Sequence, residues 1–83
     1  MMTDFASATE RVLDVREIPP QQRHEIIPRL FDNLQPGQGM QIIVDHDPRP
    51  LRYFFESVHG DDCQWNYLEQ GPEVWRVELR RAA

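Results

Sequence analysis

The stretch MQIIVDHDPRPLR, residues 40–52, decides how this chain folds. Its first five residues are apolar except for one glutamine, and alternate side chains share one face, which predicts a buried strand. Two aspartates and a Pro-x-Pro pair follow, as is typical of a strand that leads into a helix. We expect Asp47 to cap that helix and Pro48 to occupy its first position. A junction of this kind gathers polar side chains, so it also marks the candidate site.

Apolar spacing elsewhere in the chain predicts a βαβαββ order. The buried stripe of the second helix is expected to consist of Leu51, Phe54, Phe55 and Val58. The last two strands form a hairpin around a Gly-Pro turn. The predicted strands cover residues 11–16, 40–44, 63–68 and 74–80. We therefore predict an α+β fold, a two-layer α/β sandwich in which two helices pack on one face of a four-stranded mixed sheet.

Pro28 complicates the start of the first helix. Inside a regular helix, proline removes one backbone hydrogen bond and crowds the preceding turn. A helix that became regular only at Glu25 would hold Pro28 in its first turn, where the cost is small. We therefore expect a loose turn from Pro20 that tightens by Glu25, with an apolar face from Ile26 to Leu34.

Alternation divides the strand residues between the two faces of the sheet. The face toward the helices is expected to hold the large apolar side chains, whereas the outer face mixes polar residues with Ile43, Leu68 and Val74. We favour a solvated outer face, although it could also dock a partner. The residues expected to face the helices are Leu13, Val15, Met40, Ile42, Val44, Trp65, Tyr67, Trp75, Val77 and Leu79.

Length and charge narrow the class of protein. The 83 residues predict one domain over residues 11–81, preceded by a disordered tail over residues 1–10. A net charge of −5 argues against a nucleic-acid partner or an anionic membrane, because both require a basic surface. All nine basic residues are arginines, which excludes a Schiff-base lysine.

The single cysteine, Cys63, excludes an intrachain disulfide and fits a reducing cytoplasm. It follows Asp61 and Asp62, whose charges disfavour a thiolate, and alternation puts it on the packed face. We interpret it as a packing residue. No apolar run approaches the roughly 20 residues needed to cross a bilayer, and the first ten residues lack the pattern of a signal peptide. We therefore expect a cytoplasmic protein with no membrane partner.

Several strings resemble the TusA/SirA-like sulfur-carrier fold, namely LDVR at 13–16, LQPG at 34–37, and IIVD with the nearby DP at 42–48. More closely, the chain resembles a TusA-like family known as domain of unknown function 2249. The strings that carry this closer resemblance are Arg23-His24, DHDPRPLRY at 45–53 and WNYLEQGPEVWRV at 65–77. The resemblance extends over residues 13–79 and implies a single TusA-like domain.

One departure from the sulfur carriers matters. Carriers of the TusA type hold a nucleophilic cysteine at the start of the first helix, in a Cys-Pro-x-Pro motif, where the helix dipole stabilises a thiolate. In register, this chain has Pro20-Gln21-Gln22-Arg23. Proline cannot carry sulfur, so the resemblance implies the fold without the persulfide chemistry. We therefore expect a non-catalytic protein without a cofactor.

The junction and the head of the first helix supply the candidate site. Two histidines, the residue type whose charge responds most readily to pH near neutrality, stand among carboxylates and arginines, a mixture suited to binding. Arg49 and Arg52, together with Arg23, could bind a small anion. Ordinary ion pairs with neighbouring carboxylates are the simpler interpretation. The candidate residues for binding a ligand or partner are Arg23, His24, Asp45, His46, Asp47, Arg49 and Arg52.

A metal site is an alternative interpretation of the same residues. Imidazole nitrogens and carboxylate oxygens form mixed ligand sets in proteins, and the candidate ligands are His24, His46, Asp45 and Asp47. The plainer interpretation gives each residue a structural task. In that case Asp47 caps the helix, Asp45 binds backbone amides or an arginine, and His46 faces solvent.

The leading functional hypothesis is a small non-catalytic cytoplasmic accessory module that binds a protein partner or a small ligand. The resemblance implies a context in redox, metal or sulfur metabolism. The alternatives are a metal-binding protein and an atypical sulfur-transfer protein. We expect a monomer or a weak dimer, because short uncovered edge strands permit pairing.

Overall fold

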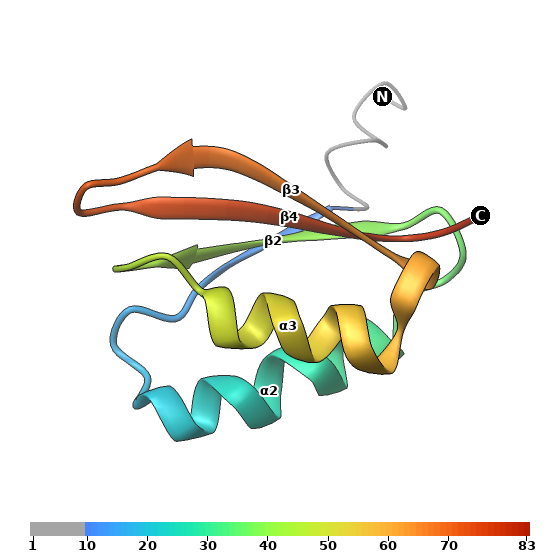
Figure 1. Ribbon diagram of the computed structural model, residues 1–83, viewed down its shortest axis with the longest axis horizontal. Coiled ribbons are helices and arrows are strands. Elements are labelled where there is room, and N and C mark those ends of the chain that lie inside the picture. The colour runs from blue at the N-terminus through green and yellow to red at the C-terminus, as the bar shows by residue number, and fades with distance from the viewer. Residues whose placement is uncertain (1–9) are drawn as a thin grey trace.

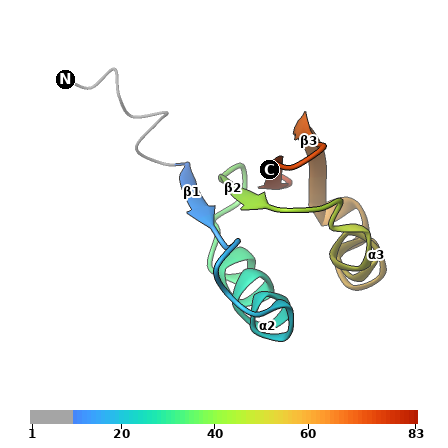
Figure 2. The same ribbon diagram turned by 90° about the vertical axis from the view of Figure 1, so that its left-hand side faces the viewer.

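Two helices cover one face of a four-stranded sheet in the computed structural model, which describes residues 10–83 (Figure 1). The order along the chain is βαβαββ, which confirms the predicted fold. The bounds are β1 (Arg11–Asp14), α2 (Pro20–Asp32), β2 (Gly39–Val44), α3 (Arg49–Val58), the 3-10 turn η2 (Gly60–Asp62), β3 (Cys63–Gln70) and β4 (Trp75–Arg81). Helix α2 lies under the β1–β2 side of the sheet and α3 lies under β3 (Figure 2).

The sheet is mixed, with the strand order β1-β2-β4-β3. The pair β1–β2 is parallel, with Leu13 opposite Ile42, and α2 supplies the crossover that a parallel pair requires. Strand β4 runs antiparallel to both of its neighbours and pairs Leu79 with Met40 on one side and with Trp65 on the other. The last strand in sequence therefore lies inside the sheet, and β1 and β3 form its edges.

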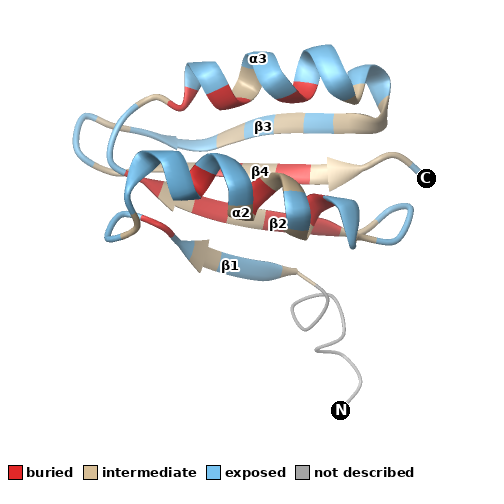
Figure 3. Ribbon diagram, turned by 90° about the horizontal axis from the view of Figure 1, so that it is seen from below, coloured by how far each residue is buried: buried red, intermediate tan, exposed pale blue. Residues whose placement is uncertain are grey.

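The core lies between the sheet and the two helices, where the buried positions of α2, β2 and β4 face one another (Figure 3). The side chains predicted to face the helices are all buried or half-buried, which confirms the predicted faces of the strands. Leu13, Trp65, Tyr67 and Trp75 are half-buried at the margin of the core. The fully buried core consists of Val15, Ile27, Phe31, Met40, Ile42, Val44, Leu51, Phe55, Val77 and Leu79.

Helix α2 is regular from Pro20, so the predicted loose turn up to Glu25 is wrong. The early start extends the buried face of the helix by one turn. The side chains that α2 buries are Arg23, Ile27 and Phe31, spaced four residues apart. Of these three, Arg23 is the residue that the early start adds, and its three hydrogen bonds offset the one backbone bond that Pro28 removes inside the helix.

Helix α3 differs from its prediction in two respects. Its N-cap is Pro48 without a side-chain cap bond, and its first residue is Arg49. The predictions that Asp47 caps the helix and that Pro48 occupies its first position are therefore both wrong. The helix also contacts the core through the narrow stripe of Leu51 and Phe55, whereas the predicted stripe included Phe54 and Val58, which are 38% and 59% exposed. Side chains three residues away on a helix point about 60° to the side, beyond the reach of this sheet. Neither α2 nor α3 has the length and apolar composition that crossing a membrane requires.

The ends of the strands also differ from the predicted ones. Strand β1 stops at Asp14, two residues before the predicted end, although the amide of Val15 still bonds the carbonyl of Ile43 at 3.0 Å. Glu10, predicted as part of a disordered tail, bonds Gln41 at 2.6 Å and Arg80 at 2.7 Å. The remainder of that predicted tail, residues 1–9, lies outside the described residues.

The outer face of the sheet carries charges that pair with one another. Arg80 contacts both Glu10 and Glu78 at 2.7 Å, and Arg76 bonds Gln41 at 3.3 Å. These contacts engage several of the charged side chains of this face, and its exposed large apolar side chains, Val12 and Leu68, belong to different strands. Such a face resembles an ordinary solvated surface, in agreement with the interpretation favoured above.

Candidate functional site

The candidate residues gather at one end of the molecule, which we call the junction end. The carboxyl ends of β1 and β2, the amino ends of α2 and α3, and the β3–β4 turn all lie there, on the left of Figure 1. In open α/β sheets, ligands bind outside the carboxyl ends of the strands. Every residue predicted for the site belongs to this end, in α2 near its start, in the β2–α3 connection, or in the first turn of α3.

Arg23 is the buried centre of the junction end, with an exposed fraction of 7%. Its Nε donates to the carbonyl of Ile18 at 2.7 Å, and Nη2 donates to the carbonyl of Arg16 at 2.9 Å. Its Nη1 donates to Asp45 Oδ1 at 3.2 Å. The guanidinium therefore ties the β1–α2 connection to the end of β2, and each of its three nitrogens makes a hydrogen bond within the fold.

Asp45 and His46 form a pair on the surface beside Arg23. Hydrogen bonds from Arg23 first, and from His46 second, lower the pKa of Asp45 from 3.8 to about 2. Nδ1 of His46 lies 2.7 Å from Asp45 Oδ1, which fits an Nδ1–H donor facing an ionised carboxylate. The His46 side chain is 62% exposed, so its Nε2 edge is open to solvent or to a binding partner.

His24 and His46 line one small pocket of about 50 Å³ between the starts of the two helices. Ile27, Val44 and Leu51 also line it, so its walls are largely apolar. Asp45 and Asp47 are not part of this lining. Within residues 10–83, no group of three or more His, Cys, Asp or Glu side chains could hold a metal ion. The four predicted ligands thus come from one end of the fold but do not converge on one point.

Asp47 binds across to the hairpin instead of capping α3. The hydroxyl of Tyr67 donates to Asp47 Oδ1 at 2.7 Å, and Arg49 Nε donates to Oδ2 at 3.0 Å. Burial alone would raise the pKa of Asp47, but the bonds from Tyr67 and Arg49 outweigh it and lower this pKa below 3.8. Asp47 therefore stays ionised and fixes Tyr67 and Arg49 in place.

A second pocket of about 280 Å³ opens on the hairpin side of Asp47. Arg52 stands on one wall, with its guanidinium carbon 5.7 Å from the centre of the Tyr67 ring and its Nε 3.0 Å from Glu56 Oε2. The ion pairs that the sequence predicted for Arg49 and Arg52 are both present. The residues that line this pocket are Asp47, Arg49, Arg52, Tyr53, Tyr67 and Gln70.

Sequence reasoning missed three members of this second pocket, namely Tyr53, Gln70 and the hydroxyl of Tyr67. Alternation placed Tyr67 among the core side chains, and its ring is indeed half-buried. A tyrosine near the end of a strand carries a polar tip beyond the packed layer, which is a usable signal. The signal could not identify the partner of the hydroxyl, because Asp47 is 20 residues away in the chain and comes close only in the folded protein.

Cys63 lies at the opposite end of the sheet from the start of α2, because β3 begins where α3 and η2 end (Figure 1). The thiol is half-buried, and burial first and the charge of Asp62 second raise its pKa from 9.0 to about 11. The interpretation of Cys63 as a packing residue agrees with its contacts to the core. A thiol of this kind is a poor nucleophile at neutral pH.

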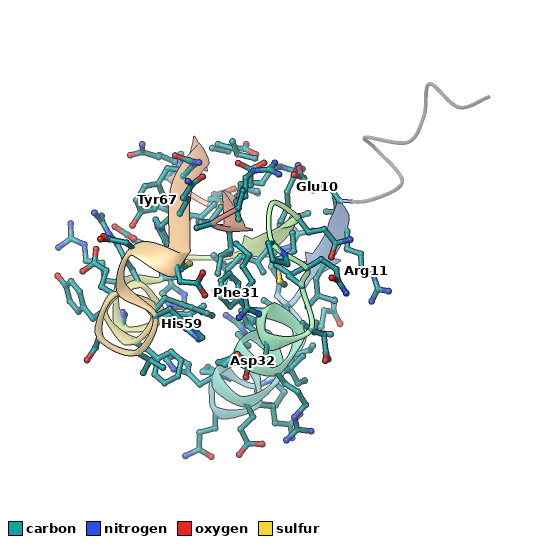
Figure 4. All side chains as sticks on the ribbon, turned by 90° about the vertical axis from the view of Figure 1, so that its right-hand side faces the viewer. Glu10, Arg11, Phe31, Asp32, His59 and Tyr67 are labelled. Carbon is teal, nitrogen blue, oxygen red and sulfur yellow. The ribbon has the colours of Figure 1, made fainter. Side chains whose placement is uncertain are left out.

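The third histidine, His59, also lies away from the junction end, beside Phe31 and Asp32 (Figure 4). Its ring stacks on Phe55 with a centroid distance of 5.5 Å and meets Phe31 edge-on at 4.8 Å. Its Nε2 is 3.6 Å from Asp32 Oδ1. These contacts give His59 a packing role between the ends of the two helices.

The fold and the site thus define a small α+β domain with a polar junction end, a buried arginine beneath it and a half-buried cysteine at the opposite end. The chain belongs to the family described as uncharacterized conserved protein, DUF2249, whose pattern matches residues 12–81. Among solved structures, the chain is similar to HP1264 from Helicobacter pylori, determined in solution. That likeness has a TM-score of 0.60 and 17% identity, covers 87% of this chain and 97% of that chain, and shows the fold alone. A search of curated proteins found no match.

Proposed function

We propose that this protein is a small non-catalytic accessory module of the cytoplasm, which binds a protein partner or a small ligand at its junction end. The observation that carries the proposal is the convergence there of two helix starts and two strand ends around the buried Arg23. Arg23 makes its hydrogen bonds within the fold and thereby holds the β1–α2 connection against the end of β2. The side chains around it, including His24, His46 and Arg49, remain exposed.

The proposed context is redox, metal or sulfur metabolism, and the resemblance to the TusA/SirA-like carriers supports it. The chain would serve in that context without carrying sulfur itself. Pro20 occupies the first position of α2, where a carrier would hold its cysteine, and the raised pKa of Cys63 disfavours a thiolate. The lone cysteine also fits a reducing compartment.

Native mass spectrometry tests this proposal. The untagged chain would be purified from its own host beside a junction variant (His24→Ala, His46→Ala and Arg49→Gln) and a control variant (Arg29→Gln and Asp61→Ala), whose altered residues are exposed elsewhere. We expect a bound mass on the parent and the control but not on the junction variant. A parent without a bound mass, or a mass retained equally by all three proteins, would contradict the proposal. Circular dichroism would verify that the variants are folded.

A further inference from the structure

The pocket of about 280 Å³ between α3 and the end of β3 has a lining rich in hydrogen-bond donors. Arg49 and Arg52 follow each other by three positions in the first turn of α3, so both side chains reach the same side of the helix. Their exposed fractions are 69% and 43%, which leaves both groups accessible. The exposed Tyr53 adds a hydroxyl and Gln70 adds an amide.

The guanidinium groups of Arg49 and Arg52 both have N–H donors that their ion pairs do not use. Arg49 bonds Asp47 through Nε, and Arg52 bonds Glu56 through Nε. A guanidinium has five N–H donors in a planar fork, and both of these bonds use Nε. The terminal nitrogens of Arg49 and Arg52 therefore have donors to offer a ligand, although Arg52 also interacts with the Tyr67 hydroxyl. A ligand with paired acceptor oxygens would accept hydrogen bonds from these remaining donors.

The carboxylate in the pocket is, in contrast, already engaged. Asp47 Oδ1 accepts from Tyr67 and Oδ2 accepts from Arg49, so each oxygen already has a partner. The pocket therefore favours a ligand that accepts hydrogen bonds over one that donates them. Because Asp47 and Glu56 formally balance the two arginines, such a ligand must share the guanidinium groups with them, and salt would weaken its binding.

The start of α3 contributes little to this preference through its backbone. The amide of Arg49 bonds the carbonyl of Asp47 at 2.9 Å, and the amide of Arg52 bonds the carbonyl of Pro48 at 3.0 Å. Pro50 has no amide hydrogen to offer. Tetrahedral phosphates are commonly bound by free amides at helix starts, whereas guanidinium planes also match the planar fork of a carboxylate.

Each of the two arginines is constrained by an ion pair before any ligand arrives. Tyr67 is anchored to Asp47, and the guanidinium of Arg52 lies over the Tyr67 ring. Asp47 holds Arg49 through the same carboxylate. Groups that are already ordered lose less conformational entropy on binding, which favours even a small ligand.

We propose that this pocket binds a carboxylate group through Arg49 and Arg52, with Tyr53 and Gln70 as additional donors. The inference rests on the proposed function and names the chemical class of the ligand at the junction end. The carboxylate belongs either to an acidic side chain of a partner protein or to a free small dicarboxylic acid, since both present the same planar group.

NMR titration of the ¹⁵N-labelled full chain tests the inference with three probes: succinate, a short glutamate-rich peptide and inorganic phosphate. We expect saturable shifts of the Nε–H signals of Arg49 and Arg52 and of the amides of Tyr53 and Gln70. Affinity should fall at least tenfold in Arg49→Gln and in Arg52→Gln, and should be unchanged in Arg29→Gln, which removes an exposed arginine of α2. Tighter binding of the peptide would assign the carboxylate to a partner protein, and tighter binding of succinate would assign it to a free acid.

Three outcomes would overturn the inference. They are the absence of saturable shifts with both carboxylate probes, shifts that survive in Arg49→Gln and Arg52→Gln, and tighter binding of phosphate than of either carboxylate. The parent protein alone decides the first and third outcomes, so they hold even if a variant fails to fold. If the carboxylate probes fail while the host-purified chain still carries a mass that depends on the junction residues, the proposed function stands and only its ligand class is wrong.

Discussion

The hydroxyl of Tyr67 donates a 2.7 Å hydrogen bond to Asp47 Oδ1 and so joins β3 to the start of α3. The two residues are 20 positions apart in the chain. One belongs to the DHDPRPLRY string and the other to the WNYLEQGPEVWRV string, which carry the family resemblance. Two strings that look independent in the sequence are therefore halves of one polar contact in the folded protein.

Removing that contact should weaken the fold measurably. Tyr67→Phe is expected to lower the free energy of unfolding by about 1 kcal/mol, because Asp47 loses a partner while it stays partly buried. Urea denaturation of Tyr67→Phe, Asp47→Asn and the double variant would give the coupling energy of the pair. Tyr53→Phe is the matched control, since Tyr53 is 60% exposed and should tolerate the change. Strictly additive effects of the two substitutions would contradict a direct interaction.

Arg23 is expected to be the most sensitive polar residue of the junction end. Arg23→Met keeps most of the volume but leaves the carbonyls of Arg16 and Ile18 without their donor, and should cost about 2–3 kcal/mol. Arg23→Lys keeps the charge but cannot reach three separate acceptors, so its loss should be intermediate. Thermal unfolding would measure both. Arg29→Met, on the exposed side of the same helix, is the control. An equal loss of stability in that variant would argue against a specific role for the hydrogen bonds of Arg23.

The low pKa of Asp45 makes the fold sensitive to acid. Because the pKa of Asp45 is about 2 in the folded protein and 3.8 ordinarily, its ionised form stabilises the fold at neutral pH. That contribution is complete above pH 3.8 and is lost as the pH falls toward 2. Asp45→Asn should therefore be less stable than the parent at pH 7, with a difference that shrinks toward pH 2.

Urea denaturation between pH 7 and pH 2 measures this difference directly. Asp61→Asn serves as the control, because Asp61 is exposed and makes no ion pair in the described part of the chain. The difference in stability between Asp61→Asn and the parent should not shrink toward pH 2 in the way expected for Asp45→Asn. A constant offset between Asp45→Asn and the parent over the whole pH range would show that the charge of Asp45 is not what stabilises the fold.

Cys63 should react slowly in the folded protein. A rise of its pKa from 9.0 to about 11 lowers the thiolate fraction at neutral pH about 100-fold, and half-burial slows access further. Mass spectrometry after iodoacetamide treatment would compare the native chain with the urea-unfolded chain. Labelling of the native chain at the rate of the unfolded one would reopen the sulfur-transfer alternative.

Two glycines provide a matched pair of substitutions. Gly60 and Gly71 have φ angles of 55° and 54°, a region that costs an L-residue about 1 kcal/mol. A Cβ at Gly60 meets nothing within 4 Å, whereas a Cβ at Gly71 would lie 2.8 Å from the Trp75 indole nitrogen. Gly71→Ala should therefore destabilise more than Gly60→Ala by about 1–3 kcal/mol and shift the tryptophan fluorescence. Equal losses in the two variants would mean that Trp75 moves aside freely.

The fold was predictable from the sequence because its elements obey simple periods. Strand β2 alternates buried and half-buried side chains, and the hairpin strands alternate about a Gly-Pro turn. The start of α2 was not predictable in this way. The cost of Pro28 is local and visible in the sequence, whereas the gain from burying Arg23 depends on carbonyls in the β1–α2 connection.

The candidate site was predictable in its location but not in its connections. The aspartates after β2 marked the correct end of the sheet, and the ion pairs of Arg49 and Arg52 with neighbouring carboxylates were expected from the sequence. The sequence could not show that Arg23 supports the fold while Arg49 is exposed, because both are arginines near a helix start. Only the packing of α2 against the sheet buries the first and leaves the second exposed.

The strand order β1-β2-β4-β3 has a consequence for biosynthesis. A ribosome that has made the chain through Gln70 has produced β1, β2 and β3, but not the strand that holds β2 and β3 together. Until Trp75–Arg81 leave the exit tunnel, β3 has no partner strand and β2 is paired only along the edge that faces β1. In the nascent chain these strands keep unpaired edges until β4 is available. A stalled translation product that ends before β4 would therefore be a natural substrate for chaperones and proteases.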